Sequence, residues 1–322
     1  MSISLAISKQ LAQSCYPDSP VSIDSFKSWR RKEKVVVVMG ATGTGKSRLS
    51  IDLASCFPAE VINSDKIQVY QGLDIVTNKV TKDETSGIPH HLLGVVDQES
   101  DFTSTDFRYL ATHALGSIVG RNHLPIIAGG SNSYIEHLVD DNELGFRAKY
   151  DCCFLWVDVS LPVLHSFVSD RVDRMVEMGL VDEVRRLFKP DGDYSRGIRR
   201  AIGVPEMDWY LRTEAYANGK TRLRMLEEAV DEIKVNTCTL ARRQLEKIRR
   251  LQSLPGWKVH RLDATDVLRM HGRQADKAWD NLIAKPSSMI VGQFLYDDGN
   301  AYRKFCRPAI VARGIPVAAG TH

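Results

Sequence analysis

The chain has 322 residues, and its 43% hydrophobic content is enough for a sizeable core in one large or two modest domains. A formal net charge of +3 is too small to indicate nucleic-acid binding by itself. No apolar run approaches the ~20 residues of a membrane-spanning helix, and the six cysteines lack zinc-like spacing, so we expect no membrane contact and no structural zinc site.

The first 33 residues differ in composition from the rest of the chain. They are rich in serine, contain more basic than acidic residues, and show no sustained apolar period. Organelle transit peptides share this composition, although Asp18 and Asp24 are atypical of them. We therefore expect residues 1–33 to be a transit-peptide remnant or an ordinary disordered leader. The expected location is the plastid, with a mitochondrial or cytoplasmic location as the alternatives.

From residue 34 onward, apolar strands and helices alternate. Strands buried on both faces and separated by helices are typical of a parallel sheet. We therefore predict an α/β core at residues 34–160, with its ligand site at the carboxyl ends of the strands. The predicted elements are, in chain order, strand Val35–Met39, helix Lys46–Cys56, strand Ala59–Ser64, helix Thr105–Val119, strand Pro125–Ala128 and strand Phe154–Val159.

After residue 160 the pattern becomes mainly helical. We expect residues 161–285 to form a helical substrate-binding region that returns to the core, and residues 286–322 to be a C-terminal tail of uncertain structure. The predicted elements of the helical region are one long amphipathic helix from Pro162 to about Phe188, a helix over about Arg222–Leu251, a strand at Trp257–Leu262 and a helix near Asp263–Ala284.

A glycine-rich loop directly follows the first predicted strand. Its residues are Gly40, Ala41, Thr42, Gly43, Thr44, Gly45, Lys46 and Ser47. Glycines let backbone N–H groups converge on phosphate oxygens, and the next helix adds its positive N-terminal end. Lys46 supplies a cation, and the Ser47 hydroxyl is placed to ligate Mg²⁺. The segment predicts a phosphate-binding loop, but kinases, hydrolases and transferases all use this motif.

Polar residues follow other predicted strands and lie on one helix. Asp65 comes after a strand and would face the loop, either as a general base or as a water-mediated magnesium ligand; capping a helix is the structural alternative. Ser131 follows two glycines in a second turn that suits phosphate contact. Arg171 and Arg174 are three residues apart and share a helix face. They could clamp an anion, or pair with neighbouring acids on a solvated surface.

Seven short segments, taken together, are more specific than any one of them. They are, in order, Gly40–Ser47, Ile62–Asp74, Gly87–Gly94, Ala128–Tyr134, Gly179–Val184, Arg200–Gly203 and Leu240–Leu245, and the region that carries them is about residues 34–262. In this order they resemble the blocks of the isopentenyltransferase (IPP transferase) family, which prenylates the N6 amine of adenine. The fold class that we predict is α/β: a P-loop NTPase-like parallel sheet flanked by helices, with a smaller helical substrate region.

The family that this chain resembles has a branch that acts on tRNA and a branch that acts on adenine nucleotides. The tRNA enzymes carry a large helical insertion after the Gly-Gly block, whereas here only Ile135–Asp151 precedes the strand that begins near Cys152. Lys66 stands where the tRNA enzymes commonly have serine, and it fits the plant adenylate isopentenyltransferases. The resemblance therefore implies ATP or ADP and dimethylallyl diphosphate as partners, with no tRNA. We expect a monomer.

The resemblance implies transfer of a dimethylallyl group from its diphosphate to the N6 amine of ATP or ADP, and possibly AMP, in cytokinin synthesis. Asp65 matches the base that takes the N6 proton. We also hypothesise that Lys220 reaches the outer phosphates of the acceptor, with a solvated lysine as the alternative. The groups assigned to the departing diphosphate are Lys46, Ser47 with Mg²⁺, Ser131, Arg171 and Arg174.

Two other functions stay open at the level of the sequence. A tRNA dimethylallyltransferase shares the chemistry but would need the missing insertion. A small-molecule or nucleotide kinase with a phosphate loop would transfer a phosphoryl group and need no prenyl donor. A nucleotide-dependent switch without catalysis is disfavoured by Asp65 and the arginine face.

Overall fold

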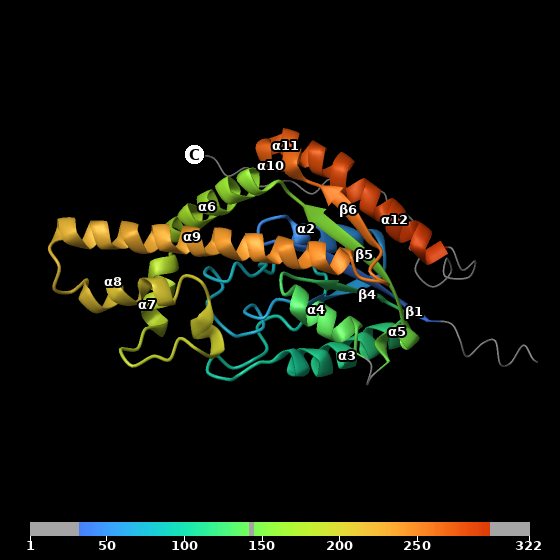
Figure 1. Ribbon diagram of the computed structural model, residues 1–322, viewed down its shortest axis with the longest axis horizontal. Helices are drawn as coiled ribbons and strands as arrows, with labels where there is room; N and C mark the ends of the chain where they lie inside the picture. Colours follow the sequence, from blue (N-terminus) through green and yellow to red (C-terminus); the bar gives the residue numbers. More distant parts are fainter. Residues whose placement is uncertain (1–31, 142–144, 297–322) are drawn as a thin grey trace, which may run out of the picture. The chain divides into compact units, whose positions relative to one another are not determined.

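A parallel six-stranded sheet forms the centre of the molecule. The computed structural model describes residues 32–141 and 145–296, and from Glu33 onward these form one compact unit. The strand order is β3-β2-β4-β1-β5-β6, with every pair parallel, which confirms the predicted α/β fold (Figure 1). The strands are β1 (Glu33–Gly40), β2 (Ala59–Asn63), β3 (His90–His91), β4 (Leu124–Ala128), β5 (Tyr150–Asp158) and β6 (Val259–Asp263).

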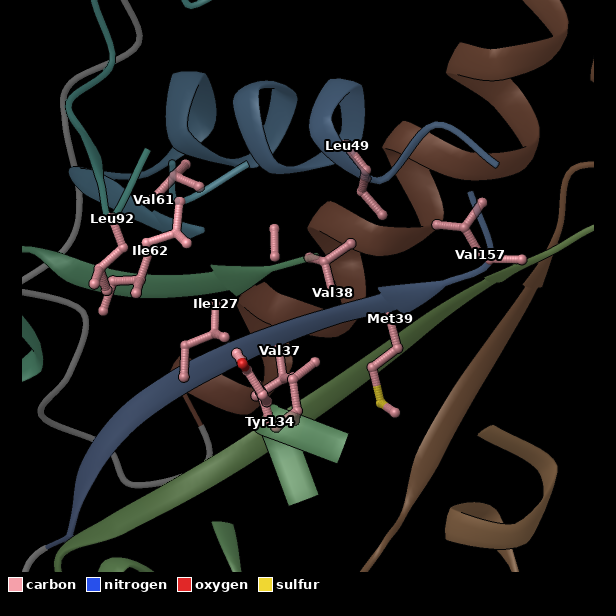
Figure 2. Close-up of a cluster of buried hydrophobic side chains, with 14 of the residues drawn as sticks. Val37, Val38, Met39, Leu49, Val61, Ile62, Leu92, Ile127, Tyr134 and Val157 are labelled. Atoms are coloured by element: carbon pink, nitrogen blue, oxygen red, sulfur yellow. The ribbon is translucent and has the colours of Figure 1, made fainter. Parts of the chain in front are cut away.

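The central strand β1 is buried on both faces. Its valines, residues 35–38, are 0% exposed, which explains why this strand is a continuous β-branched run rather than an alternating one. Successive side chains point to opposite faces of the sheet. Figure 2 shows Val38 on the same face as Leu49, and Val37 and Met39 on the other face with Tyr134. The end of β1 is thereby held firmly where the phosphate loop begins.

Helices cover both faces of the sheet. On one face, α2 (Lys46–Cys56) packs on β1, β2 and β4, and it coincides with the predicted helix. The other face carries α3 and α4, with the 34-residue α9 packed against α4, α6 and β1 (Figure 1). The remaining helices are α3 (Ser104–Gly120), α4 (Asn132–Val139), α5 (Phe146–Lys149), α6 (Leu161–Glu177), α7 (Leu180–Leu187), α8 (Asp208–Thr213), α9 (Gly219–Gln252), α10 (Thr265–Arg269), α11 (Gly272–Trp279) and α12 (Lys285–Tyr296).

The long helix predicted after Pro162 is wrong as a single element. Gly179 lies between α6 and α7 with φ 102°, a left-handed conformation that L side chains disfavour, so the helix stops and a new one begins. The hydrophobic spacing continues across the break because both helices bury residues against the same core. Periodicity alone therefore did not reveal the glycine break.

The C-terminal helix predicted near 263–284 is also divided. It consists of α10, α11 and a π-helical turn, η4 (Asp280–Ala284), that continues into α12. The predicted tail therefore begins as helix, because α12 extends to Tyr296. The predicted leader lies almost wholly outside the described residues, as do residues 297–322. No helix in residues 32–141 and 145–296 has the length and apolar character needed to cross a membrane.

A buried carboxylate joins four segments of the chain near the amino-terminal ends of β2 and β4, away from the phosphate loop. Glu60 of β2 is 3% exposed and accepts hydrogen bonds from Arg121 at 2.7 and 3.0 Å. His91 of β3 and His123, just before β4, also contact it, at 2.7 and 2.8 Å. Burial raises the pKa of Glu60, but the bonds from Arg121, His91 and His123 outweigh burial and lower it to about 2. The charge of Glu60 is therefore fully compensated.

We expect Glu60→Gln to lower the free energy of unfolding at pH 7 by about 2–3 kcal/mol, because the depressed pKa of Glu60 represents stabilisation of the folded state. This contribution is complete above the usual glutamate pKa of 4.5 and is lost as the pH falls towards about 2. Urea unfolding at several pH values measures it. The exposed Glu227→Gln is the control, and equal stability of the two variants at pH 7 would contradict the assignment.

Candidate functional site

A cavity of about 460 Å³ lies at the carboxyl ends of the strands, where the sequence predicted the ligand site. The phosphate loop lines the cavity, and so do the segments that follow β2 and β4. Helices α6 and α9 close the cavity together with residues 200–202. The helical region therefore supplies part of the same site as the α/β core.

The phosphate loop lines the cavity at the start of α2, where no side chain of the described residues caps the helix. Gly45 is the N-cap of α2, with φ 91°, and it offers no side chain to cap the first N–H groups of the helix. The first turn of α2 contains no acidic residue. Unpaired N–H groups and the positive end of the helix dipole therefore favour an anion at this point.

Lys46 points back over the loop, where its Nζ donates to the carbonyl of Ala41 at 2.7 Å. Burial lowers the pKa of Lys46 to about 8; Asp65 acts in the opposite direction, and Arg171 acts with burial. The ammonium group has thus lost solvation that protein groups do not fully replace. A phosphate in the loop would supply the missing negative charge.

Asp65 uses its two carboxylate oxygens differently. Oδ1 accepts from the backbone N–H of Ile67 at 2.9 Å and of Gln68 at 3.3 Å. These bonds hold a turn at residues 66–69, where no helix begins, so Asp65 is not the helix cap considered above. Oδ2 makes no hydrogen bond with a described residue, and Asp65 lines the cavity beside Gly130. One oxygen therefore fixes the side chain while the other is available to a ligand.

Arg171 and Ser131 support the loop and the Asp65 segment. Arg171 lines the cavity and donates to the hydroxyl of Thr42 at 2.8 Å, while its buried Nε has no partner among the described residues. Burial, aided by Arg174, lowers the pKa of Arg171 to about 10, so the guanidinium remains charged at neutral pH. Ser131 Oγ accepts from the backbone N–H of Lys66 at 2.9 Å, next to Asp65.

Two of the candidate residues lie away from the cavity. Arg174 is exposed and lies over the Phe167 ring at 5.7 Å, so only one of the two arginines turns inward. Lys220 is exposed near the start of α9, thirteen residues before Ile233, the first α9 residue that lines the cavity. That separation is about 20 Å along a helix. The fold gives Lys220 no contact with a ligand in this cavity.

Two cavity residues were not singled out from the sequence. Gln244 of α9 accepts from the N–H of Thr42 at 2.7 Å and donates to the carbonyl of Gly130 at 3.0 Å. Arg200 lines the cavity and donates to the hydroxyl of Tyr70 at 3.2 Å. Both lie in the conspicuous sequence blocks 200–203 and 240–245. Their roles depend on a fold that brings α9 and residue 200 to the phosphate loop.

The lining of the cavity combines cationic and apolar side chains. Among the described residues Asp65 is the only acid that lines it, against the cations Lys46, Arg48, Lys66, Arg171 and Arg200. Apolar side chains from α6, α9 and residue 202 also line it: Phe167, Val172, Met175, Ile202, Ile233 and Leu240. Such a cavity suits ligands that combine phosphate groups with an apolar part.

The donors near the loop fit a magnesium ion that is shared with a phosphate ligand. Ser47 and Asp65 both line the cavity. Neither the Ser47 hydroxyl nor Asp65 Oδ2 makes a hydrogen bond with a described residue. Mg²⁺ usually takes one or two protein oxygens and keeps waters and substrate phosphates as its other ligands. No group of three or more His, Cys, Asp or Glu residues in the described chain forms a protein-only metal cage.

The lowered pKa of Lys46 predicts how phosphate binding changes with pH. Below about pH 8 the ammonium is charged, so Lys46 adds no pH dependence to the affinity for inorganic pyrophosphate; as the pH rises through 8, its contribution to affinity is lost. Calorimetric titration with pyrophosphate and Mg²⁺ measures the dissociation constant. Lys46→Arg is the matched control. Because arginine stays charged, the pH dependence of its dissociation constant should come only from the titration of pyrophosphate itself. The same pH dependence in both proteins would contradict the role of Lys46.

Comparisons with known proteins show which family the chain resembles. The family model described as IPP transferase matches residues 68–148 and 141–251. Adenylate isopentenyltransferase 5, chloroplastic, from Arabidopsis thaliana is 64% identical, with 84% of this chain and 83% of the relative covered. Adenylate isopentenyltransferase 7, mitochondrial, from the same plant is 55% identical, with 88% and 85% covered.

Similarity to enzymes that act on tRNA is lower. The tRNA dimethylallyltransferase 2 of Arabidopsis thaliana is 32% identical over 83% of this chain and 81% of the relative. That alignment spans 380 positions, more than this chain has residues, so parts of the tRNA enzyme have no counterpart here.

Solved structures share the fold. A eukaryotic dimethylallyltransferase acting on tRNA matches with a TM-score of 0.69 and 25% identity, with 83% of this chain and 80% of that chain covered. The tRNA isopentenylpyrophosphate transferase of Bacillus halodurans gives a TM-score of 0.65 and 27% identity, with 82% and 99% covered. With this family match and this extent of similarity, the chain belongs to the IPP transferase family.

Proposed function

We propose that this protein is an adenylate isopentenyltransferase, which transfers a dimethylallyl group from dimethylallyl diphosphate to the N6 amine of ATP or ADP, with AMP as the alternative acceptor, in cytokinin synthesis. The observation that carries the proposal is the cavity itself, where a phosphate loop and five cations adjoin an apolar wall and one carboxylate. A prenyl diphosphate has the same division into an anionic and an apolar part. Relatives named adenylate isopentenyltransferase support the choice of acceptor.

The cationic part of the cavity stabilises the charge that develops on the leaving group. As the allylic C–O bond breaks, negative charge grows on the diphosphate and positive charge spreads over the prenyl carbons. Lys46, Arg171 and the first N–H groups of α2 receive the diphosphate. Ser47 would hold Mg²⁺, which would supply further charge neutralisation. The apolar wall of α6 and α9 keeps water from the prenyl cation.

Asp65 completes the transfer as the general base. The N6 lone pair of adenine is delocalised into the ring, so the amine must lose a proton as its bond to the prenyl carbon forms. Asp65 Oδ2 takes this proton, while Oδ1 stays bound to the N–H groups of Ile67 and Gln68. The products are the prenylated nucleotide and diphosphate.

The acceptor's phosphates lie outside the loop in this proposal. Lys66 and Arg200 line the cavity beyond the loop and are the cations that can meet them, in place of Lys220. Only residues 140–149 separate α4 from β5, which is too short a segment for the insertion expected of a tRNA enzyme. A nucleotide rather than tRNA is therefore the proposed acceptor. Separately, we propose that the enzyme acts as a monomer.

A plastid location is proposed on two grounds. The first 33 residues have the composition of a transit peptide, and the relative with 64% identity is named chloroplastic. A mitochondrial location is the alternative, since another relative is named mitochondrial.

The reaction is tested by incubating the protein with Mg²⁺, dimethylallyl diphosphate and, separately, AMP, ADP, ATP or unmodified tRNA. Mass analysis is expected to find ADP or ATP heavier by one C5H8 unit and no change in tRNA. A kinase would instead yield a phosphorylated product without the prenyl donor. Prenylation of tRNA alone would favour the tRNA branch of the family.

Asp65→Asn is expected to lower kcat by about 10²–10⁴-fold, since asparagine cannot accept the N6 proton. Asparagine can still accept the N–H groups of Ile67 and Gln68, so the thermal unfolding midpoint should stay near that of the wild type. Steady-state kinetics and a thermal melt measure the two effects. Near-normal turnover in this variant would remove Asp65 from the mechanism.

A further inference from the structure

Trp279, at the end of α11, packs directly against the phosphate loop. Its side chain is 2% exposed, and the outer ring atoms Cη2 and Cζ3 lie only 2.6 and 2.7 Å from the position that a Cβ atom on Gly45 would occupy. The ring therefore fills the space beside the glycine whose left-handed backbone opens α2 towards the cavity. Any shift of Gly45 in this direction meets the indole.

The indole ring is held in place by α2 itself. Its Nε1 donates to Asp52 Oδ2 at 2.7 Å, and the guanidinium of Arg48 lies over the ring at 4.8 Å. Arg48 in turn donates to Asp276 of α11 at 3.0 Å. A hydrogen bond, a cation–π contact and an ion pair thus join α11 to the helix that begins at the phosphate loop.

The backbone after Trp279 is adapted to this contact. The π-helical turn η4 begins at the next residue and packs on α2, and its Ile283 is 0% exposed. A π-helical turn inserts extra backbone into a helix and often occurs at functional sites. Figure 1 shows α10, α11 and α12 together along one side of the molecule, beyond α2.

We propose that Trp279 is a positioning residue for the phosphate loop, which holds the Gly45 peptide in the geometry that binds the diphosphate of the prenyl donor. The choice of donor rests on the proposed function; the effect on diphosphate binding does not. The indole touches the loop from outside the cavity, since Trp279 is absent from the cavity lining. It acts on the ligand only through Gly45 and α2.

Trp279→Phe removes the outer ring atoms that meet Gly45 and the N–H that meets Asp52, while it keeps an aromatic ring in the core. We expect the dissociation constant for inorganic pyrophosphate with Mg²⁺ to rise about ten- to 10²-fold, since small displacements of binding groups have effects of this size. In turnover, the KM for dimethylallyl diphosphate should rise while the KM for ATP stays unchanged. A general loosening of the fold would change both KM values.

Trp257→Phe is the matched control. Trp257 is 3% exposed, donates to Asp140 at 3.1 Å and lies under the Arg147 guanidinium at 5.5 Å, but it is not part of the cavity. Its substitution should lower stability to a similar extent and leave pyrophosphate affinity unchanged. Thermal melts of both variants provide the comparison.

Asp52→Ala provides a second variant if Trp279→Phe does not fold. It leaves the ring in place and removes its hydrogen-bond acceptor, so we expect a smaller loss of pyrophosphate affinity in the same direction. The proposal would be overturned if folded Trp279→Phe or Asp52→Ala bound pyrophosphate with the same dissociation constant as Trp257→Phe. Absence of prenyl transfer by the wild type would refute the proposed function instead, while the pyrophosphate comparison would still decide the role of Trp279.

Discussion

The site depends on one side chain, Gln244, which joins three parts of the chain. Its amide accepts from Thr42 in the phosphate loop and donates to Gly130 in the turn after β4. Both groups are backbone atoms at the carboxyl edge of the sheet, and buried backbone groups need partners. The long helix α9 is therefore registered against the loop by a polar contact as well as by apolar packing. Through this contact, the apolar wall of the helical region faces the cationic loop.

The loop and the apolar wall together make the protein chemically selective. A phosphate loop alone binds many ligands, as its occurrence in several enzyme classes shows. Here the loop adjoins apolar side chains of α6 and α9, together with Arg171 and Gln244 of the same helices, and Asp65 lines the same cavity. This arrangement favours a donor with a diphosphate and a hydrocarbon chain, and it leaves the nucleotide as acceptor rather than as phosphate source.

Elements whose residue types are set by their immediate surroundings could be predicted from the sequence. The valine run, the glycine-rich loop and the helix from Lys46 to Cys56 were predicted because strand burial and phosphate binding impose their own residue types. The break at Gly179 was missed because the apolar spacing continues across it. Gln244, Arg200 and Trp279 act through contacts with residues distant in sequence, and the distance of Lys220 from the loop depends on the length and direction of α9.

The central claim is that the loop holds the diphosphate of the prenyl donor while the nucleotide occupies other positions in the cavity. It is tested most directly by titrating ATP into protein that is already saturated with inorganic pyrophosphate and Mg²⁺. The account predicts that one ATP still binds per chain, because the two ligands use different parts of the cavity. An ATP dissociation constant that rises in proportion to the pyrophosphate concentration would show competition for the loop and would contradict it.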